Sequence, residues 1–432
     1  MSTTPGSNLE ATLLSLIDER APELTGKVVA WRRDIHANPE LGNREFRTAK
    51  LVADHLRALD LEVKTGVAHT GVVGVLRGGL PGPVVALRAD MDALPVAEEV
   101  DVPFASKARG QFEGQDVGVM HACGHDCHVA VLMGVAELFA GIRQRLPGTI
   151  KFLFQPAEEM PPENEEGGAK LMIEEGVLDD EPRPQAIFGL HVTSMLNVGV
   201  IGYKPGPAMA SADRVDITVR GRQTHGAMPW LGADPVVASA HVIVGLQTVV
   251  SRQVDTVRQP AIVTIAAIHG GLRQNIIPDD VHMFGTVRTF DEDLRDEVHQ
   301  RIEDTAEHIA RGCRCEADVR IRRGYPVTVN HEGLTAWAEP RLKRVAGERA
   351  ILVPKITGAE DFSYFQQRIP GFFYFIGITP PDKNPAHAPA NHSPRFYVDE
   401  DGLPIALRSL ASLAAGYLAA PMPEKMPDKA TS

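Results

Sequence analysis

The sequence predicts an α/β protein in which a three-layer domain with a mixed sheet carries an inserted α+β domain. Two observations indicate the layered domain: short apolar runs typical of strands buried on both faces, and helical segments between them. A third observation is the change of pattern after Tyr203–Pro207 (YKPGP). A chain of 432 residues is also long enough for two domains. We therefore expect residues 1–207 and 324–432 to form one discontinuous domain and residues 208–323 to form the insertion.

The layered domain is expected to start with helical sequence between residues 9 and 60, interrupted at Asn38-Pro39 because proline disfavours helix at the residue before it. Four apolar runs predict buried strands: Gly71–Leu76, Pro83–Leu87, Thr149–Phe154 and Ala186–Leu190. Further helices are predicted at Val129–Ile142 and Ala169–Glu175. After the insertion the pattern returns with a helix, a strand and a helix: Leu334–Ala346, Phe372–Ile378 and Leu403–Ala419.

The inserted region alternates apolar and polar residues, as a half-exposed sheet does. Its first strand has Val215, Ile217 and Val219 on one face, and Asp234-Pro235 then marks a helix start. The later elements are two strands, a helix and a strand: 261–268, 281–290, 294–309 and 313–321. This β-α-β-β-α-β order is that of the split ferredoxin-like unit.

The composition is that of a soluble globular protein, with 44% hydrophobic and 23% charged residues. The net charge of −12 argues against binding to nucleic acid or to an anionic membrane. The sequence has no signal segment at its start and no apolar run of about 18 residues. Four cysteines are too few for a disulfide scaffold. We predict a reduced cytoplasmic protein that binds neither nucleic acid nor membrane.

One stretch of nine residues, Met120–His128 (MHACGHDCH), concentrates three histidines, two cysteines and an aspartate. A thiolate, an imidazole and a carboxylate this close together are typical of a transition-metal site. The alternative is a reduced core cysteine beside surface histidines. This stretch alone leaves both interpretations open, because short motifs often match by chance.

Polar side chains also follow the predicted strands at their carboxyl ends, where open α/β sheets form their sites. They are Asp90 and Asp92, Glu158 and Glu159, and His191. Because side chains alternate in extended chain, one glutamate can bind a metal while the other takes a proton from water. Either aspartate could bind metal or orient a histidine that does. Each feature alone could be a solvated strand end or a helix cap, but together they are hard to explain as packing.

Ten segments, in order, resemble a known family. They are HANPELGNRE (36–45), ALRADMDALPV (86–96), MHACGHD (120–126), FQPAEE (154–159), GLHV (189–192), THGAMP (224–229), NIIPD (275–279), GTVRTF (285–290), GAEDFSYF (358–365) and NHSPRF (391–396). The chain resembles the metal-dependent amidohydrolases that include hippurate hydrolase, N-acyl-amino-acid aminoacylases and plant hydrolases of auxin–amino acid conjugates. These enzymes are similar in turn to carboxypeptidase G-type metallopeptidases with a co-catalytic metal pair.

The resemblance implies a role for each matching residue. Two divalent ions per subunit (Zn, Mn, Co or Ni) would be held by five ligands, of which Cys123 would join the two metals: Cys123, His125, Glu159, His191 and His392. Glu158 would be the general base, and Asp92 would orient a ligand. The insertion would form a homodimer, or part of a higher oligomer, and His225 would reach into the partner's site as an oxyanion donor. Asn275 and Arg288 would hold the substrate carboxylate, and Gly358 would begin a loop that lines the site.

We therefore expect hydrolysis of an N-acyl amino acid by a metal-activated water. One alternative is a dipeptidase or aminopeptidase with the same metals, and another is a ligand-binding protein without turnover. Two departures from the family bear on this choice. Cys127 adds a second thiol to the metal motif, and Met160–Glu166 (MPPENEE) is a longer and more acidic link that could anchor a free amine. The acyl group, the amino-acid side chain, its stereochemistry and the metal stay open.

Overall fold

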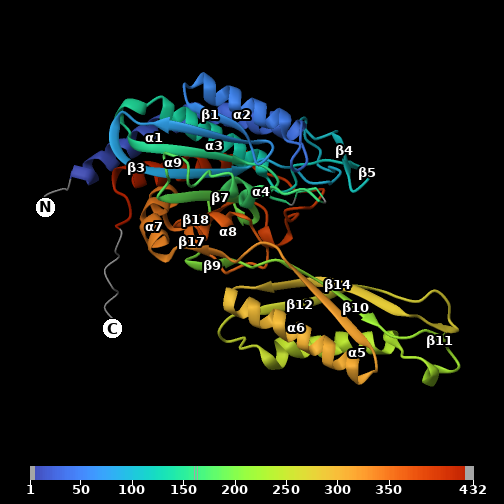
Figure 1. Cartoon of the computed structure of the whole chain (residues 1–432). Helices are drawn as coiled ribbons and strands as arrows, with labels where there is room; N and C mark the ends of the chain where they lie inside the picture. The colour runs from blue at the N-terminus through green and yellow to red at the C-terminus, as the bar shows by residue number, and fades with distance from the viewer. Residues whose placement is uncertain (1–4, 160, 163, 424–432) are drawn as a thin grey trace. The chain divides into compact units, whose positions relative to one another are not determined.

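The computed structural model describes residues 5–159, 161–162 and 164–423, which form two compact units (Figure 1). Unit 1 runs up to Gly206 and also contains Asn330–Pro354 and the chain from Tyr364 onward. Unit 2 consists of Pro207–Val329 and Lys355–Ser363. The second segment of unit 2 lies in the part of the sequence that we assigned to the layered domain.

Unit 1 is built on a mixed sheet of eight strands in the order β1-β2-β6-β3-β7-β18-β8-β17. The strands are β1 (Glu62–Val67), β2 (Gly71–Arg77), β3 (Leu80–Asp90), β6 (Pro147–Gln155), β7 (Ala186–Asn197), β8 (Ile201–Tyr203), β17 (Ala350–Leu352) and β18 (Gly371–Thr379). The central strands β6, β3, β7 and β18 are parallel to one another. Every residue of β6 and β18 is buried, as expected for strands covered on both faces. The predicted fold class is confirmed.

The helices of unit 1 follow the predicted helical segments closely. They are α1 (Pro5–Ala37), α2 (Phe46–Ala58), α3 (His125–Ala140), α4 (Gly168–Glu174), α7 (Glu332–Ala346) and α9 (Leu403–Ala419). Helix α1 packs on α3 and α9, and these two helices contact β3 and β7. α1 ends at Ala37, two residues before Pro39, for the steric reason that predicted the break.

Unit 2 has the predicted β-α-β-β-α-β order. It contains β10 (Asp213–Arg220), α5 (Pro235–Thr248), β12 (Ala261–His269), β14 (Asp280–Thr289), α6 (Glu292–Gly312) and β15 (Glu316–Arg323). The antiparallel sheet has the order β12-β14-β10-β15, and α5 and α6 pack side by side (Figure 1). The Asp234 side chain caps α5 by accepting hydrogen bonds from two backbone N–H groups.

The start of the last strand was predicted wrongly. The alternation suggested a strand from Cys313, but Cys313 is the C-cap of α6 and β15 begins at Glu316. Arg314, at φ 60°, makes the turn between them. A helix end and a strand start that follow each other directly share one apolar pattern, so the pattern could not separate them.

The remaining elements are short. The strands are β4 (Arg109–Phe112), β5 (Gln115–Gly118), β9 (Gly206–Met209), β11 (Thr224–His225), β13 (Ile276–Ile277) and β16 (Thr328–Asn330). The helical turns are η1 (Arg143–Arg145), η2 (Pro229–Leu231), η3 (Val249–Gln253), η4 (Gly347–Arg349), α8 (Phe362–Gln366), η5 (Pro385–His387) and η6 (Glu400–Gly402).

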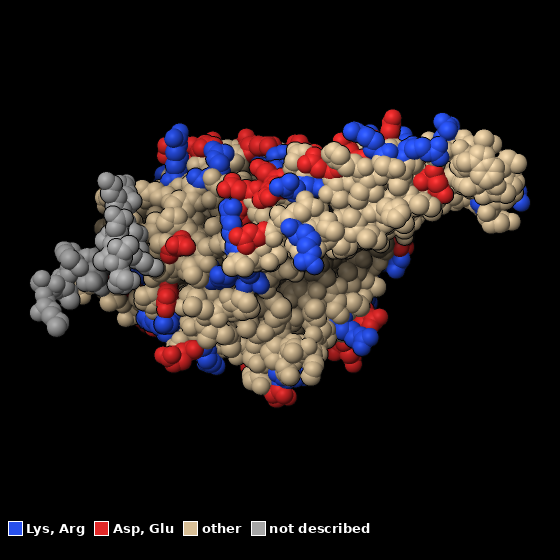
Figure 2. Space-filling view, turned by 90° about the horizontal axis from the view of Figure 1, so that it is seen from below, with Lys and Arg blue, Asp and Glu red and all other residues tan. Residues whose placement is uncertain are grey.

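Two helical stretches of the described chain are long and apolar enough to cross a membrane, judged by length and composition alone: Pro235–Gln253 and Glu400–Ala419. The second is 78% buried, which is typical of a core helix, and the first packs on the unit 2 sheet through Ala238, Val242 and Leu246. On the face shown in Figure 2, basic and acidic side chains are interspersed. The whole sequence has 44 lysine and arginine residues and 56 aspartate and glutamate residues.

Candidate metal centre and active site

The candidate site of unit 1 begins where the carboxyl ends of β3 and β6 lie next to each other. Asp90 at the end of β3 lies opposite Gln155 at the end of β6 in the parallel ladder. Asp92 follows the first strand and Glu158 and Glu159 follow the second, so the loops that carry these carboxylates leave the same edge of the sheet. This is the arrangement that the sequence predicted.

His191 comes to the site from inside a strand, not from its end as we expected. β7 continues to Asn197 because β18 keeps pairing with it beyond Leu190, with Phe375 opposite His191. The predicted residue is therefore close to the site, on a longer strand than the pattern indicated.

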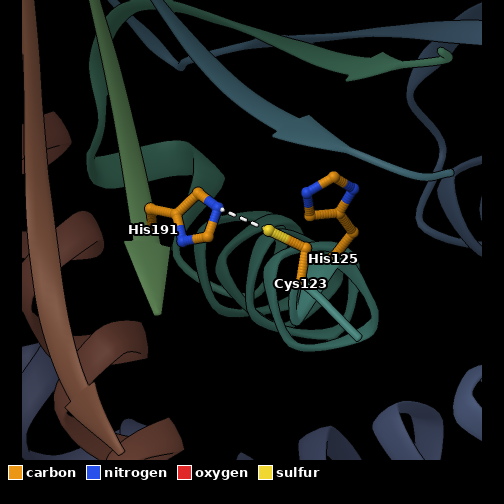
Figure 3. A group of neighbouring side chains, drawn as sticks. All are labelled: Cys123, His125 and His191. Atoms are coloured by element: carbon orange, nitrogen blue, oxygen red, sulfur yellow. Dashed lines mark hydrogen bonds between the residues drawn. The ribbon is translucent and has the colours of Figure 1, made fainter. Parts of the chain in front are cut away.

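The motif MHACGHDCH forms the entry to α3, and it projects Cys123 and His125 toward His191 (Figure 3). Gly124 is the N-cap of this helix and has a left-handed backbone, with φ 93°. A side-chain Cβ at this position would lie 2.3 Å from Cγ2 of Val192 on β7. Only glycine therefore lets the motif approach β7 this closely.

Cys123 lies at the centre of the cluster. Its Sγ is 3.3 Å from Nε2 of His191 and 3.2 Å from Nε2 of His392. The same nitrogen of His392 lies 2.9 Å from Oε1 of Glu159. Four of the five predicted ligands are thus in direct contact, although they come from four separate segments of the chain.

The fifth predicted ligand, His125, is oriented by Asp92. Nδ1 of His125 is 2.9 Å from the Asp92 carbonyl oxygen and 3.2 Å from its Oδ1, and Asp92 Oδ2 accepts a hydrogen bond from the Glu159 N–H. The other nitrogen, Nε2, is buried and has no hydrogen-bond partner among the described residues. It lies 3.8 Å from Asp90, 3.9 Å from Glu158 and 4.0 Å from Glu159. A buried imidazole nitrogen without a hydrogen-bond partner that faces three carboxylates fits a metal ligand.

The ligand atoms form overlapping groups, in each of which the atoms lie within 4.8 Å of one another. One group is Cys123, His125 and His191; a second is Cys123, Glu159 and His392; a third is His125 with Glu158 and Glu159. Cys123 belongs to two of these groups, as expected of a thiolate shared by two metals. Sulfur, nitrogen and oxygen donors together suit Zn, Co, Ni or Mn.

The electrostatics of the site favour cations. Burial, Glu159 and Glu158 all raise the pKa of the Cys123 thiol, so its thiolate form requires a compensating positive charge. Burial lowers the pKa of His125, but Asp90 and Asp92 outweigh burial and raise it to about 10. The cluster therefore carries more negative than positive groups, and divalent ions would neutralise the excess.

The motif suggested that His128 supports the ligands or lies at a helix start, but not which residues it contacts. Its Nδ1 donates to Asp90 Oδ1 at 2.6 Å, and its Nε2 accepts a hydrogen bond from the N–H of Val192, next to His191. Arg88 donates to the same aspartate at 2.6 Å. His128 therefore connects β3 with the strand that carries His191. The signal available in the sequence was its place three residues after His125, on the same face of a helix.

The other residues of the motif turn away from the cluster. Asp126 pairs with Arg32 and His36, each at 2.8 Å. Cys127 is fully buried in the core and belongs to none of the candidate ligand groups among the described residues. Both ring nitrogens of His121 are buried and have no hydrogen-bond partner in the described chain, and nothing in the structure explains this.

The four remaining predicted residues belong to unit 2. His225 on β11 is exposed and lies next to Asn275, whose carbonyl oxygen accepts a hydrogen bond from the Gly226 N–H. Arg288 lies half-buried on β14 and has no carboxylate within ion-pair distance among the described residues. Gly358 accepts a hydrogen bond from the Ala210 N–H.

Comparison with known proteins agrees with this geometry. Residues 86–416 match the family described as peptidase family M20/M25/M40. The chain is 40% identical to thermostable carboxypeptidase 2 of Saccharolobus solfataricus over 408 residues, which are 94% of this chain and 99% of the relative. It is 38% identical to an N-acetylcysteine deacetylase of Bacillus subtilis over 389 residues, which are 90% and 96% of the two chains.

The fold comparison agrees as well. A solved structure from Bacillus subtilis, described as a dinuclear metal-binding peptidase, matches with a TM-score of 0.76 and 35% identity, covering 92% of this chain and 99% of the other. The sequence and structural matches extend over nearly the whole length of each protein. The chain therefore belongs to peptidase family M20/M25/M40 and is a hydrolase of amide bonds.

Proposed function

We propose that the protein is a metal-dependent amidohydrolase that converts N-acyl amino acids into a carboxylic acid and a free amino acid. The observation that carries this proposal is the cluster of Cys123, His125, Glu159, His191 and His392 beside Glu158, a carboxylate that is 5% exposed. A relative named N-acetylcysteine deacetylase supports the substrate class. Glu158 would serve as the general base.

The five clustered residues would hold two divalent ions (Zn, Mn, Co or Ni). When bound, these ions would lower the pKa of water and polarise the amide carbonyl. Glu158 would take the proton from the attacking water and pass it to the leaving amine. Asp92 would keep His125 and the Glu159 backbone in place, since it contacts both.

Unit 2 would supply the groups that recognise the substrate. The Arg288 guanidinium lacks a carboxylate partner in the described chain, so it would bind the amino-acid carboxylate, and Asn275 would share this role. His225 would donate to the developing oxyanion, and the segment from Gly358 would line the site. We propose that His225 acts across a homodimer formed through unit 2, and that the enzyme works in the cytoplasm.

The acidic link between Glu159 and Gly167 bears on the alternative, a dipeptidase. Met160 and Glu163 of this link lie outside the described residues. Glu165 pairs with Arg44 and accepts a hydrogen bond from Asn43. Its charge is thus already neutralised, so Glu165 would not anchor a free α-amine.

Glu158→Gln tests the proposal. Glutamine keeps the shape of the side chain but cannot take a proton, so turnover should fall by about 10²–10⁴-fold while the metal content stays unchanged. Benzoyl-glycine and N-acetyl amino acids should be assayed against unblocked dipeptides on metal-loaded protein. Turnover that survives in the variant would show that Glu158 is not the base, and a preference for dipeptides would favour the peptidase.

A further inference from the structure

The loop that carries Glu158 and Glu159 is held at its base by contacts that the proposed mechanism does not use. Ala157, the residue before Glu158, is fully buried and has a left-handed backbone, with φ 49°. This conformation is unfavourable for a residue with a side chain, and it persists only where the surroundings impose it.

The backbone of Ala157 is bound by Glu45, which lies between α1 and α2, directly before the first residue of α2. Glu45 Oε1 accepts a hydrogen bond from the Ala157 N–H at 2.9 Å, and its Oε2 accepts one from the Thr70 hydroxyl at 2.5 Å. Glu45 itself is fully buried. Without Glu45 the buried N–H of Ala157 would lose this acceptor, and a buried donor without an acceptor is destabilising.

The other end of the loop is held by the neighbours of Glu45. Asn43 donates to Glu165 Oε2 and to the Glu166 carbonyl, at 3.1 and 3.0 Å. Arg44 pairs with Glu165. A Cβ at Gly167 would lie 2.9 Å from Asn43 Oδ1 and 3.2 Å from Ala157 Cβ, so the two ends of the loop meet at this segment.

We propose that Asn43–Glu45 is a positioning element, in which Glu45 sets the orientation of Glu158 and Glu159 through the backbone of Ala157. The proposal rests on the proposed function for its kinetic test and on the metal cluster for its binding test. The Glu45 carboxyl is hydrogen-bonded to Ala157 and Thr70, so it acts through the loop, and the charge of Asp92 also acts on it.

Glu45→Gln is a close mimic of the native side chain. Burial and the charge of Asp92 raise the pKa of Glu45 to about 8, which favours the uncharged form that glutamine resembles. A glutamine oxygen can still accept from Ala157, and its amide can donate to the Thr70 oxygen. Glu45→Ala removes both contacts.

Glu40 provides a matched control in the same segment. Its carboxylate also accepts hydrogen bonds from backbone N–H groups, those of Arg47 and Thr48 at 2.8 Å, but these belong to α2 and not to the loop. Glu40→Ala should therefore lower the melting temperature without changing the site.

The experiment compares Glu45→Ala, Glu45→Gln and Glu40→Ala in the full-length, metal-reconstituted protein. We expect Glu45→Ala to lower kcat at least 10-fold at saturating metal, with KM changed less than 3-fold, and Glu45→Gln to restore kcat to within 3-fold of the native value. The Co²⁺-loaded Glu45→Ala protein should also show an altered visible spectrum and weaker Co²⁺ binding against a chelator. Glu40→Ala should keep the native kcat and spectrum.

The outcomes separate the two proposals. If the native protein hydrolyses no N-acyl amino acid, the proposed function fails, and the Co²⁺ spectrum and affinity still test the positioning role. An unchanged kcat and spectrum in folded Glu45→Ala would overturn that role. Equal losses in Glu45→Ala and Glu40→Ala would overturn it too, because they would reflect general stability. If Glu45→Ala does not fold, Glu45→Gln provides the test. A folded Glu45→Gln protein with an altered Co²⁺ spectrum would overturn the positioning role, because glutamine can keep both contacts.

Discussion

At the scale of single residues, the two thiols of MHACGHDCH differ only in their surroundings. Cys123 Sγ faces the imidazoles of His191 and His392, at 3.3 and 3.2 Å. Cys127 is one helical turn further on, enclosed by the core of unit 1. Burial and the charge of Asp126 raise the pKa of the Cys127 thiol, which keeps it protonated and unreactive. Cys123 thus faces the cluster because it precedes α3, whereas Cys127 lies within α3 and packs in the core.

This difference predicts the effects of two serine substitutions. Cys123→Ser should weaken metal binding by more than about 10-fold and reduce activity accordingly, because a hydroxyl is a poorer ligand than a thiolate. Cys127→Ser should change metal affinity little and should mainly lower stability, because it buries a hydroxyl in the core. Competition with a chromogenic chelator measures both affinities. The opposite order would mean that Cys127 is the ligand.

At the scale of elements, most of the fold could be predicted because long elements have their own periodicity. The helices and the fully buried strands have clear patterns, whereas β8 and β17, three residues each, exist only because neighbouring strands pair with them. The strand-end carboxylates were predictable for the same reason. Two contacts could not be predicted in this way. Asp90 and His128 are 38 residues apart in the sequence, and Glu45 and Ala157 are 112 residues apart. No local pattern encodes such distances.

The junction between α3 and β7 gives a prediction at this scale. Gly124→Ala would force a side chain into Val192 and strain a left-handed backbone, so the start of α3 would have to move away from β7. Because Cys123 and His125 flank this position and His191 precedes Val192, we expect weaker metal binding and turnover reduced by about 10-fold or more. Isothermal titration with Zn²⁺ and an activity assay would measure this.

Gly114→Ala is the control for Gly124→Ala. The φ of Gly114 is also positive, at 75°, but a Cβ at this position would meet nothing within 4 Å. Equal effects of the two changes would contradict the argument.

Unit 2 depends on a buried charge network at the start of β10. Asp213 accepts hydrogen bonds from Arg295 and His299 of α6 and from the Gly324 N–H. Burial opposes ionisation of Asp213, but the bonds from His299 and Arg295 outweigh it and lower its pKa to about 2. The network therefore joins a strand, a helix and the chain segment that follows β15.

We expect Asp213→Asn to destabilise unit 2 by about 3 kcal/mol, because the buried Arg295 would keep only the partly exposed Glu292 as a counter-charge. The folded pKa lies below the usual value of 3.8, so the native stabilisation is present above about pH 4 and is lost as the pH falls toward 2. Urea unfolding between pH 7 and pH 3, followed by circular dichroism, would show the two proteins converging at low pH. A constant difference over this range would mean that the charge of Asp213 is not the cause.

At the scale of the whole molecule, the candidate metal ligands all belong to unit 1 but come from segments that are far apart in the sequence. Cys123 and His125 precede or open α3, Glu159 follows β6, His191 lies in β7 and His392 lies in the loop before α9. An ion that binds these side chains connects the sheet with the start of α3 and with the loop before α9. It can bind only when all of its ligands are in place. Binding to the folded state alone stabilises that state by mass action.

Metal should therefore raise the melting temperature of the protein. At a free metal concentration of about 100 times the Kd, the expected stabilisation is about 2.7 kcal/mol, or about 4 °C for a unit of this size. Calorimetry of the chelator-treated protein with and without added Zn²⁺, Mn²⁺, Co²⁺ or Ni²⁺ measures the shift and ranks the metals. Cys123→Ser should show a much smaller shift, whereas Cys127→Ser should keep the full shift from a lower starting temperature. A metal that stabilises Cys123→Ser as strongly as the native protein would be binding elsewhere on the molecule.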